Sequence, residues 1–95
     1  MPIVKIGNFN YKKSTRKDKK LMVFLKGGKV VHFGNPNYQH FKDKTGIWKK
    51  LDHNDPQRRE NYLKRAKGIK NKKGELTWKD PTSPNYHAIK ILWNG

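Results

Sequence analysis

The 95-residue chain carries 23 Lys and Arg residues against 7 Asp and Glu, a formal net charge of +16 at pH 7. It has no cysteine, which excludes disulfide bonds and cysteine-ligated zinc, and no apolar run of about 18 residues, which excludes a membrane span. The short, mixed N-terminus is not typical of a secretory signal peptide, so we expect a protein that is not secreted. The length predicts a single domain, 1–95.

The charge predicts a polyanionic partner, for which nucleic acid is the most common choice. The 23 basic residues are 19 Lys and 4 Arg. Lysine is a flexible point charge, whereas arginine has the planar fork that reads guanine, so a lysine-rich surface favours phosphate contact over sequence readout. Aromatic residues make up 12% of the chain, which argues against a disordered basic tail.

The N-terminal part combines a short apolar stretch with a basic run. Residues 3–6 predict a short strand, and residues 12–20, KKSTRKDKK, predict a mobile basic loop. A solvated loop without a ligand and a nuclear-import signal are the alternatives for this run. The candidate phosphate contacts in it are Lys12, Lys13, Arg16, Lys17, Lys19 and Lys20.

Residues 21–34, LMVFLKGGKVVHFG, predict a β-hairpin. Two β-rich runs flank Gly27 and Gly28, which adopt the positive φ angles of a two-residue turn at little cost. Such a turn places Lys26 opposite Lys29, an unfavourable pair of like charges that a polyanion would relieve. The alternative is that both side chains extend into water. Both faces of the hairpin are largely apolar, so we expect it to be covered on each side.

A helix is predicted over 56–67. Asp55 is a favourable N-cap, Pro56 suits the first helical position, and Gly68 suits the position after the last turn. Arg59 lies close to the apolar side of this helix, so we expect it to hold a carboxylate or a backbone carbonyl. A solvated helix face is the alternative for the other basic residues. The candidate phosphate contacts on the helix are Arg58, Lys64 and Arg65, and those of the turn-rich link after it are Lys72 and Lys73.

The C-terminal stretch repeats the same capping pattern. Ser83 as N-cap and Pro84 at the first position predict a short, largely buried helix, with a strand as the alternative. We interpret Trp93 as a core side chain rather than a platform for stacking bases.

An Asp-His pair, Asp52 and His53, raises the question of a metal-dependent nuclease. Asn61 and His87 offer the remaining residue types of an HNH-like site, but the spacing does not fit, because Pro56 starts a helix directly after His53. The four histidines lack a metal-ligand spacing such as i, i+4, and no glycine-rich phosphate loop is present. We therefore expect no enzymatic activity, no metal and no cofactor, and we keep a nuclease as the disfavoured alternative.

The order of three motifs resembles a family of small basic proteins from bacteriophages and large double-stranded DNA viruses. These motifs are the FGNP turn at 33–36, the DPxRRxxYxxR helix at 55–65 and the Trp-containing end at 86–93, and the resemblance covers about residues 29–95. Asn35 stands where the pattern often has Asp, and the His and Cys that often follow the helix are absent. The resemblance implies a viral source and a place in or near the virion. Binding of nucleic acid, DNA in preference to RNA, is inferred from the charge instead.

We therefore predict an α+β domain in which a β-hairpin, or a three-stranded antiparallel sheet if the N-terminal strand joins it, packs with two short helices. The leading hypothesis is low-specificity binding of nucleic acid in the virion or the interior of an infected cell. A minor capsid or cement protein that binds acidic capsid surfaces is the second hypothesis, and the nuclease is the third. A regulator that binds an acidic host protein is a further alternative. Sequence alone does not determine the oligomeric state.

Overall fold

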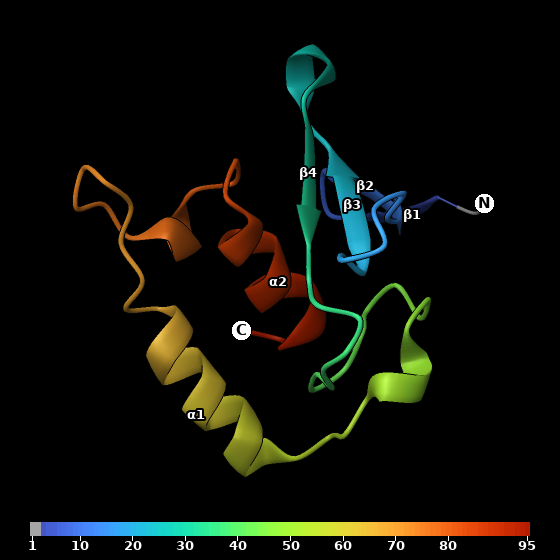
Figure 1. The fold of residues 1–95 in the computed structure, drawn as a ribbon, viewed down its shortest axis with the longest axis vertical. Helices are drawn as coiled ribbons and strands as arrows, with labels where there is room; N and C mark the ends of the chain where they lie inside the picture. Colours follow the sequence, from blue (N-terminus) through green and yellow to red (C-terminus); the bar gives the residue numbers. More distant parts are fainter. Residues whose placement is uncertain (1–2) are drawn as a thin grey trace.

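The chain folds into a four-stranded antiparallel sheet and two helices (Figure 1), and the computed structural model describes residues 3–95. The strands pair in chain order as a meander: β1 (Val4–Ile6), β2 (Phe9–Lys13), β3 (Leu21–Phe24) and β4 (Val30–Phe33). The predicted α+β class is confirmed, although the sheet has four strands rather than two or three. The additional strand is β2, which includes Lys12 and Lys13 and so takes the start of the run that was predicted to be a loop. The mobility of the remaining loop residues stays a prediction.

The hairpin between β3 and β4 has a different loop from the predicted one. Its turn contains the three residues Lys26–Gly28 and is closed by a hydrogen bond from Leu25 N to Lys29 O (2.8 Å). Gly27 and Gly28 both have a φ of 78°, a left-handed conformation that glycine adopts freely. Lys26 therefore lies within the turn, and the predicted pairing of Lys26 opposite Lys29 is wrong.

Packing of the core explains this shift of one residue. Val23 pairs with Tyr11 on one side and Val31 on the other, and all three side chains are buried in one row. A two-residue turn would instead pair Val23 with His32. Because side chains alternate between the two faces of a strand, a slip of one residue would turn an apolar row out of the core.

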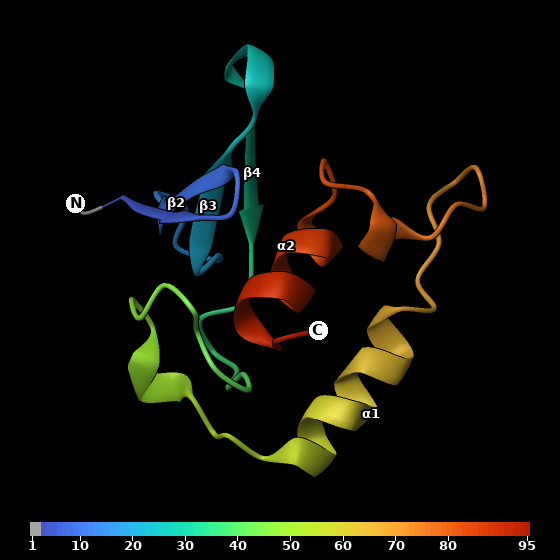
Figure 2. The same cartoon turned by 180° about the vertical axis from the view of Figure 1, so that it is seen from behind.

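Helix α2 (Pro84–Leu92) covers the face of the sheet that carries this row (Figures 1 and 2). Phe33, Ile91 and Leu92 are almost fully buried between the two layers, and Trp93 is 9% exposed, which confirms that it is a core side chain. The opposite face is covered only in part, because Met22 is buried there while Val30 is exposed. The expectation that both faces are covered is therefore correct only in part.

Both predicted helices form, and their N-terminal caps explain where they begin. Asp55 accepts a hydrogen bond from Gln57 N (3.0 Å) at the start of α1 (Pro56–Ala66), which ends one residue before the predicted end. Ser83 accepts one from Asn85 N (3.2 Å) at the start of α2, so the strand alternative is wrong. Helix α2 lies between β4 and α1 (Figure 1). No helix within residues 3–95 is long and apolar enough to cross a membrane.

The turn after β4 depends on Gly34, which has a φ of 80°. A Cβ atom at this position would lie 3.0 Å from Leu92 Cδ1 and 3.1 Å from Lys20 Cβ. Gly34→Ala is therefore expected to lower the free energy of unfolding by about 2–3 kcal/mol, through backbone strain and crowding together. Urea unfolding measures the loss.

Gly28→Ala is the matched control for this substitution. Gly28 has a similar φ of 78°, but no heavy atom outside its neighbours in the chain lies within 4 Å of an added Cβ. Gly28→Ala therefore introduces only the backbone strain of a positive φ. A smaller loss for Gly28→Ala is expected, and equal losses would show that the contacts around Gly34 relax without cost.

Candidate functional site

The loop after β4 projects a tyrosine into solvent. Asn35 O accepts a hydrogen bond from Tyr38 N (3.1 Å), and Asn35 Oδ1 accepts one from Asn37 N (2.9 Å). Asn before Pro36 favours such a turn, because its side chain bonds to the backbone two residues on while proline presets φ. Tyr38 is 68% exposed.

A buried lysine holds the backbone of this tyrosine. Lys20 is 2% exposed, and its Nζ donates hydrogen bonds to Tyr38 O (2.6 Å) and His40 Nδ1 (2.7 Å). His40 Nε2 in turn donates to Asp52 Oδ1 (2.6 Å), because its Nδ1 already accepts from the lysine. These hydrogen bonds fix the orientation of the Tyr38 peptide unit from inside the protein.

Burial sets the protonation states in this network. It lowers the pKa of Lys20 to about 8, although the nearby carboxylates of Asp43 and Asp52 favour the charged form. Burial and the charge of Lys20 also lower the pKa of His40, so the imidazole is neutral at pH 7. Lys20 was predicted to contact phosphate from the surface. That prediction is wrong, because its ammonium group is enclosed and already bonded to protein acceptors.

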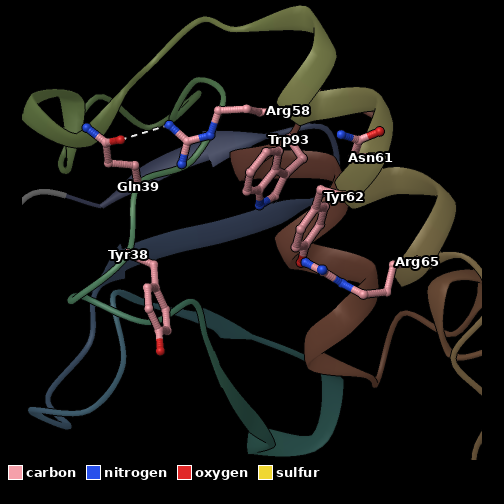
Figure 3. A pocket seen from close by; sticks show the side chains of 7 residues that line it. All are labelled: Tyr38, Gln39, Arg58, Asn61, Tyr62, Arg65 and Trp93. Carbon is pink, nitrogen blue, oxygen red and sulfur yellow. Dashed lines mark hydrogen bonds between the residues drawn. The ribbon is translucent and has the colours of Figure 1, made fainter.

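Tyr38 forms one side of a pocket of about 420 Å³ beside α1 (Figure 3). The loop and α1 both contact the end of α2: Lys42 N donates to Leu92 O (3.0 Å), and Tyr62 stacks on Trp93. The lining side chains are Tyr38 and Gln39 from the loop, Arg58, Asn61, Tyr62 and Arg65 from α1, and Trp93 after α2. A smaller cavity of about 160 Å³ shares several of these residues and extends toward Lys20 and Leu92.

A pair of stacked aromatic rings forms the inner wall of the pocket. The rings of Tyr62 and Trp93 lie 4.0 Å apart between centres with an angle of 7° between their planes. Burial raises the pKa of the Tyr62 hydroxyl, consistent with a ring that is enclosed by its neighbours. The stack joins α1 to the end of α2, so the pocket wall is part of the packed structure.

Two of the four arginines are bound to a carboxylate or to backbone carbonyls. Arg16 pairs with Asp18 at 3.1 Å. Arg59 donates to Trp93 O (3.0 Å) and Asn94 O (2.7 Å), which confirms the prediction that it holds a backbone carbonyl. Arg59 thus links α1 to the C-terminal end and has a structural role.

The other two arginines both line the pocket. Arg58 donates to the side-chain oxygen of Gln39 (2.9 Å), and the Arg65 guanidinium lies 5.8 Å from the ring centre of Tyr62. Within residues 3–95, no carboxylate forms an ion pair with either of them. The pocket therefore has two cationic groups whose charge no carboxylate of the described residues neutralises, and the one contact of Arg58 there is with a neutral amide.

The remaining predicted phosphate contacts are spread over separate places. Four of these basic residues line a second depression of about 270 Å³ together with Trp48. Lys12 lies on the outer face of β2, above the ring of Phe24. The hairpin tip lies at the opposite end of the molecule's longest axis from α1 (Figure 1). On α1 itself, the Lys64 ammonium group pairs with the Glu60 carboxylate at 3.4 Å. The four in the depression are Lys13, Arg16, Lys17 and Lys19; the two at the tip are Lys26 and Lys29; the two in the loop after α1 are Lys72 and Lys73.

The residues considered for a nuclease do not form one site. Asp52 bonds to His40 rather than His53, and His53 Nδ1 accepts a hydrogen bond from Asp55 N (2.9 Å). His87 is buried on the other side of the core, between the hydroxyl of Tyr11 and a backbone carbonyl. In the part of the chain that the structure describes, no three His, Asp or Glu side chains are grouped so that they could hold a metal ion.

Sequence reasoning found the two arginines of the pocket but missed its other side. Tyr38 and Gln39 directly follow the FGNP turn at 33–36 and were not among the predicted contacts. Their one sequence signal is an aromatic residue within a run of Gly, Asn and Pro. The buried network behind Tyr38 has no comparable signal, because Lys20 is the last of several adjacent bases.

Fold and site together define a small α+β domain with an antiparallel meander, a covering helix and an arginine-lined aromatic pocket. Residues 10–46 are similar to a family of unknown function (DUF5754). The match runs from β2 through the loop that carries Tyr38, covers fewer than half of the 95 residues and ends before α1. No curated protein and no solved structure matches the chain.

Proposed function

We propose that this protein is a non-enzymatic, low-specificity nucleic-acid-binding protein, with Arg58 and Arg65 as its main phosphate contacts. The observation that carries the proposal is the division among the four arginines. Arg16 is paired with a carboxylate and Arg59 with two backbone carbonyls, whereas within residues 3–95 Arg58 and Arg65 have neither kind of partner and line the same pocket. A guanidinium group that is free to form bidentate hydrogen bonds suits a phosphate better than an ammonium group does.

The placement of the two arginines on α1 suits an extended backbone. They are seven residues apart, so they lie on the same face of the helix, separated by about 10 Å along its axis. The exposed lysines elsewhere supply long-range attraction without choosing a sequence. A viral source and association with the virion rest on the resemblance of the three sequence motifs, whereas nucleic acid as the partner rests on the charge.

A salt series with a short labelled DNA duplex, followed by fluorescence anisotropy, tests the proposal. We expect micromolar or tighter affinity near about 0.15–0.2 M salt, with a log–log slope that corresponds to about 4–8 phosphates. Binding that vanishes by about 0.1 M salt would indicate generic charge. A capsid protein or another acidic protein would then be the better partner to test.

Removing both arginines is expected to weaken binding equally on all sequences and to reduce the salt slope by about 2. Arg58→Ala/Arg65→Ala is compared with Lys72→Ala/Lys73→Ala, which removes the same charge from a loop away from the pocket. The lysine variant is expected to lose less affinity. Equal losses from the two variants would mean that the arginines are not the main contacts, and a change in sequence preference would contradict phosphate-only binding.

A further inference from the structure

We infer that the pocket beside α1 accepts an unpaired nucleobase against Tyr38, so that the protein prefers single-stranded to duplex nucleic acid. This inference rests on the proposed function and specifies which form of nucleic acid the site takes. It follows from three features of the pocket: an exposed aromatic ring on a fixed backbone, an aromatic interior, and arginines at its edge.

The first feature is the combination of an exposed ring and a held backbone at Tyr38. Its side chain is 68% exposed, whereas its carbonyl is bonded to the buried ammonium group of Lys20 at 2.6 Å. An aromatic ring that is presented from an ordered backbone loses little conformational entropy when a flat ligand stacks on it. Base–aromatic stacking also tolerates any sequence, because every base has a π face.

The second feature is that the interior of the pocket suits a base better than a phosphate. Tyr38 lies across the pocket from the stacked rings of Tyr62 and Trp93 (Figure 3). The side-chain amides of Gln39 and Asn61 add hydrogen-bond donors and acceptors of the kind that pair with base edges. The Tyr62–Trp93 stack packs α1 against the end of α2, so the exposed Tyr38 ring is the aromatic group of the pocket that packing does not explain.

The third feature is the position of the charges relative to this interior. Arg58 and Arg65 project from α1 at two separate edges of the pocket, and Arg58 reaches the loop at Gln39 (Figure 3). From these positions they can bind the phosphates on either side of an inserted base. A base within a duplex is stacked and paired, and it reaches such a pocket only after extrusion from the helix, which costs free energy. A single strand has no such cost, so the pocket favours it.

Three labelled ligands of equal length test the inference at about 0.15 M salt, where weak non-specific binding is reduced. They are an oligodeoxythymidine, a mixed-sequence duplex and a single strand made of abasic residues. The abasic strand has the same phosphates as the oligodeoxythymidine but no bases. We expect the oligodeoxythymidine to bind more tightly than both of the others.

Tyr38→Ala is the matching protein variant. It is expected to weaken binding of the oligodeoxythymidine about 5-fold or more and to leave the abasic strand and the duplex unchanged. Tyr38→Trp is expected to keep or improve the affinity. Ile69→Ala, which truncates another exposed apolar side chain, is expected to change none of the three. Because the Tyr38 ring is exposed, its removal is expected to leave the melting temperature unchanged. Measuring that temperature checks that the variant is folded.

The outcomes separate this inference from the proposed function. If Tyr38→Ala weakens binding of all three ligands equally or of none, or if the abasic strand binds as tightly as the oligodeoxythymidine, the inference fails while the phosphate-binding function stands. If none of the three ligands binds, both fail.

Discussion

Replacing Asp43 with alanine is expected to lower the free energy of unfolding by at least about 3 kcal/mol. Asp43 is 4% exposed, and its carboxylate accepts three hydrogen bonds. Two come from the backbone N (2.8 Å) and hydroxyl (2.6 Å) of Thr45, and the third comes from Trp48 N (2.7 Å). Alanine leaves all three partly buried donors without their partner.

The effect of this substitution extends beyond the loop that Asp43 organises. Trp48 Nε1 donates to Lys20 O (2.7 Å), so a displaced Trp48 loosens the start of β3. The Asp43 carboxylate also favours the charged form of Lys20, and its loss leaves the buried ammonium group with less compensating charge. Urea unfolding, monitored by tryptophan fluorescence and by circular dichroism, measures the loss.

Asp80→Ala is the matched control, because Asp80 makes the same motif at the surface. Its Oδ1 accepts hydrogen bonds from Thr82 N (2.9 Å) and the Thr82 hydroxyl (2.7 Å), but the group is exposed. Water replaces these bonds in the variant, so a much smaller loss is expected. Similar losses at the two positions would show that burial is not what makes Asp43 important.

The free energy of unfolding is expected to rise by about 2 kcal/mol between pH 7 and pH 9.5, through Lys20 alone. Burial lowers the pKa of Lys20 from its ordinary value of 10.5 to about 8 in the folded protein. Below pH 8 the group is charged in both states, and the full cost of burying the charge is present. As the pH rises from 8 toward 10.5, the folded protein loses this proton while the unfolded chain keeps it, so stability increases.

Comparison with Lys20→Met isolates the contribution of this one group from the other lysines. Methionine fills a similar volume and does not titrate, so the variant lacks this rise with pH, whatever its stability at pH 7. Unfolding free energies at several pH values, measured for both proteins, give the difference. Parallel curves for the two proteins would mean that Lys20 does not carry a lowered pKa.

The helices and their caps were determined by the sequence itself. Asp55-Pro56 and Ser83-Pro84 set the starts of α1 and α2 through contacts within a few residues, so local patterns were sufficient. The structural role of Arg59 was also predictable, because its position on the helix places it beside the apolar stripe. The α+β class followed from these helices and the glycine-centred hairpin.

Contacts between distant parts of the chain decided the rest. The hairpin register depends on how Val23 and Val31 pack beneath α2, and the turn residues alone are compatible with either register. Lys20 is buried because His40, Asp52 and the Tyr38 carbonyl surround its ammonium group, whereas in the sequence it looks like its basic neighbours. The pocket arises only where the loop after β4, α1 and the end of α2 meet. Burial and hydrogen-bond partners determine which of many similar basic side chains is structural and which is available to bind a ligand. Both are properties of the folded chain.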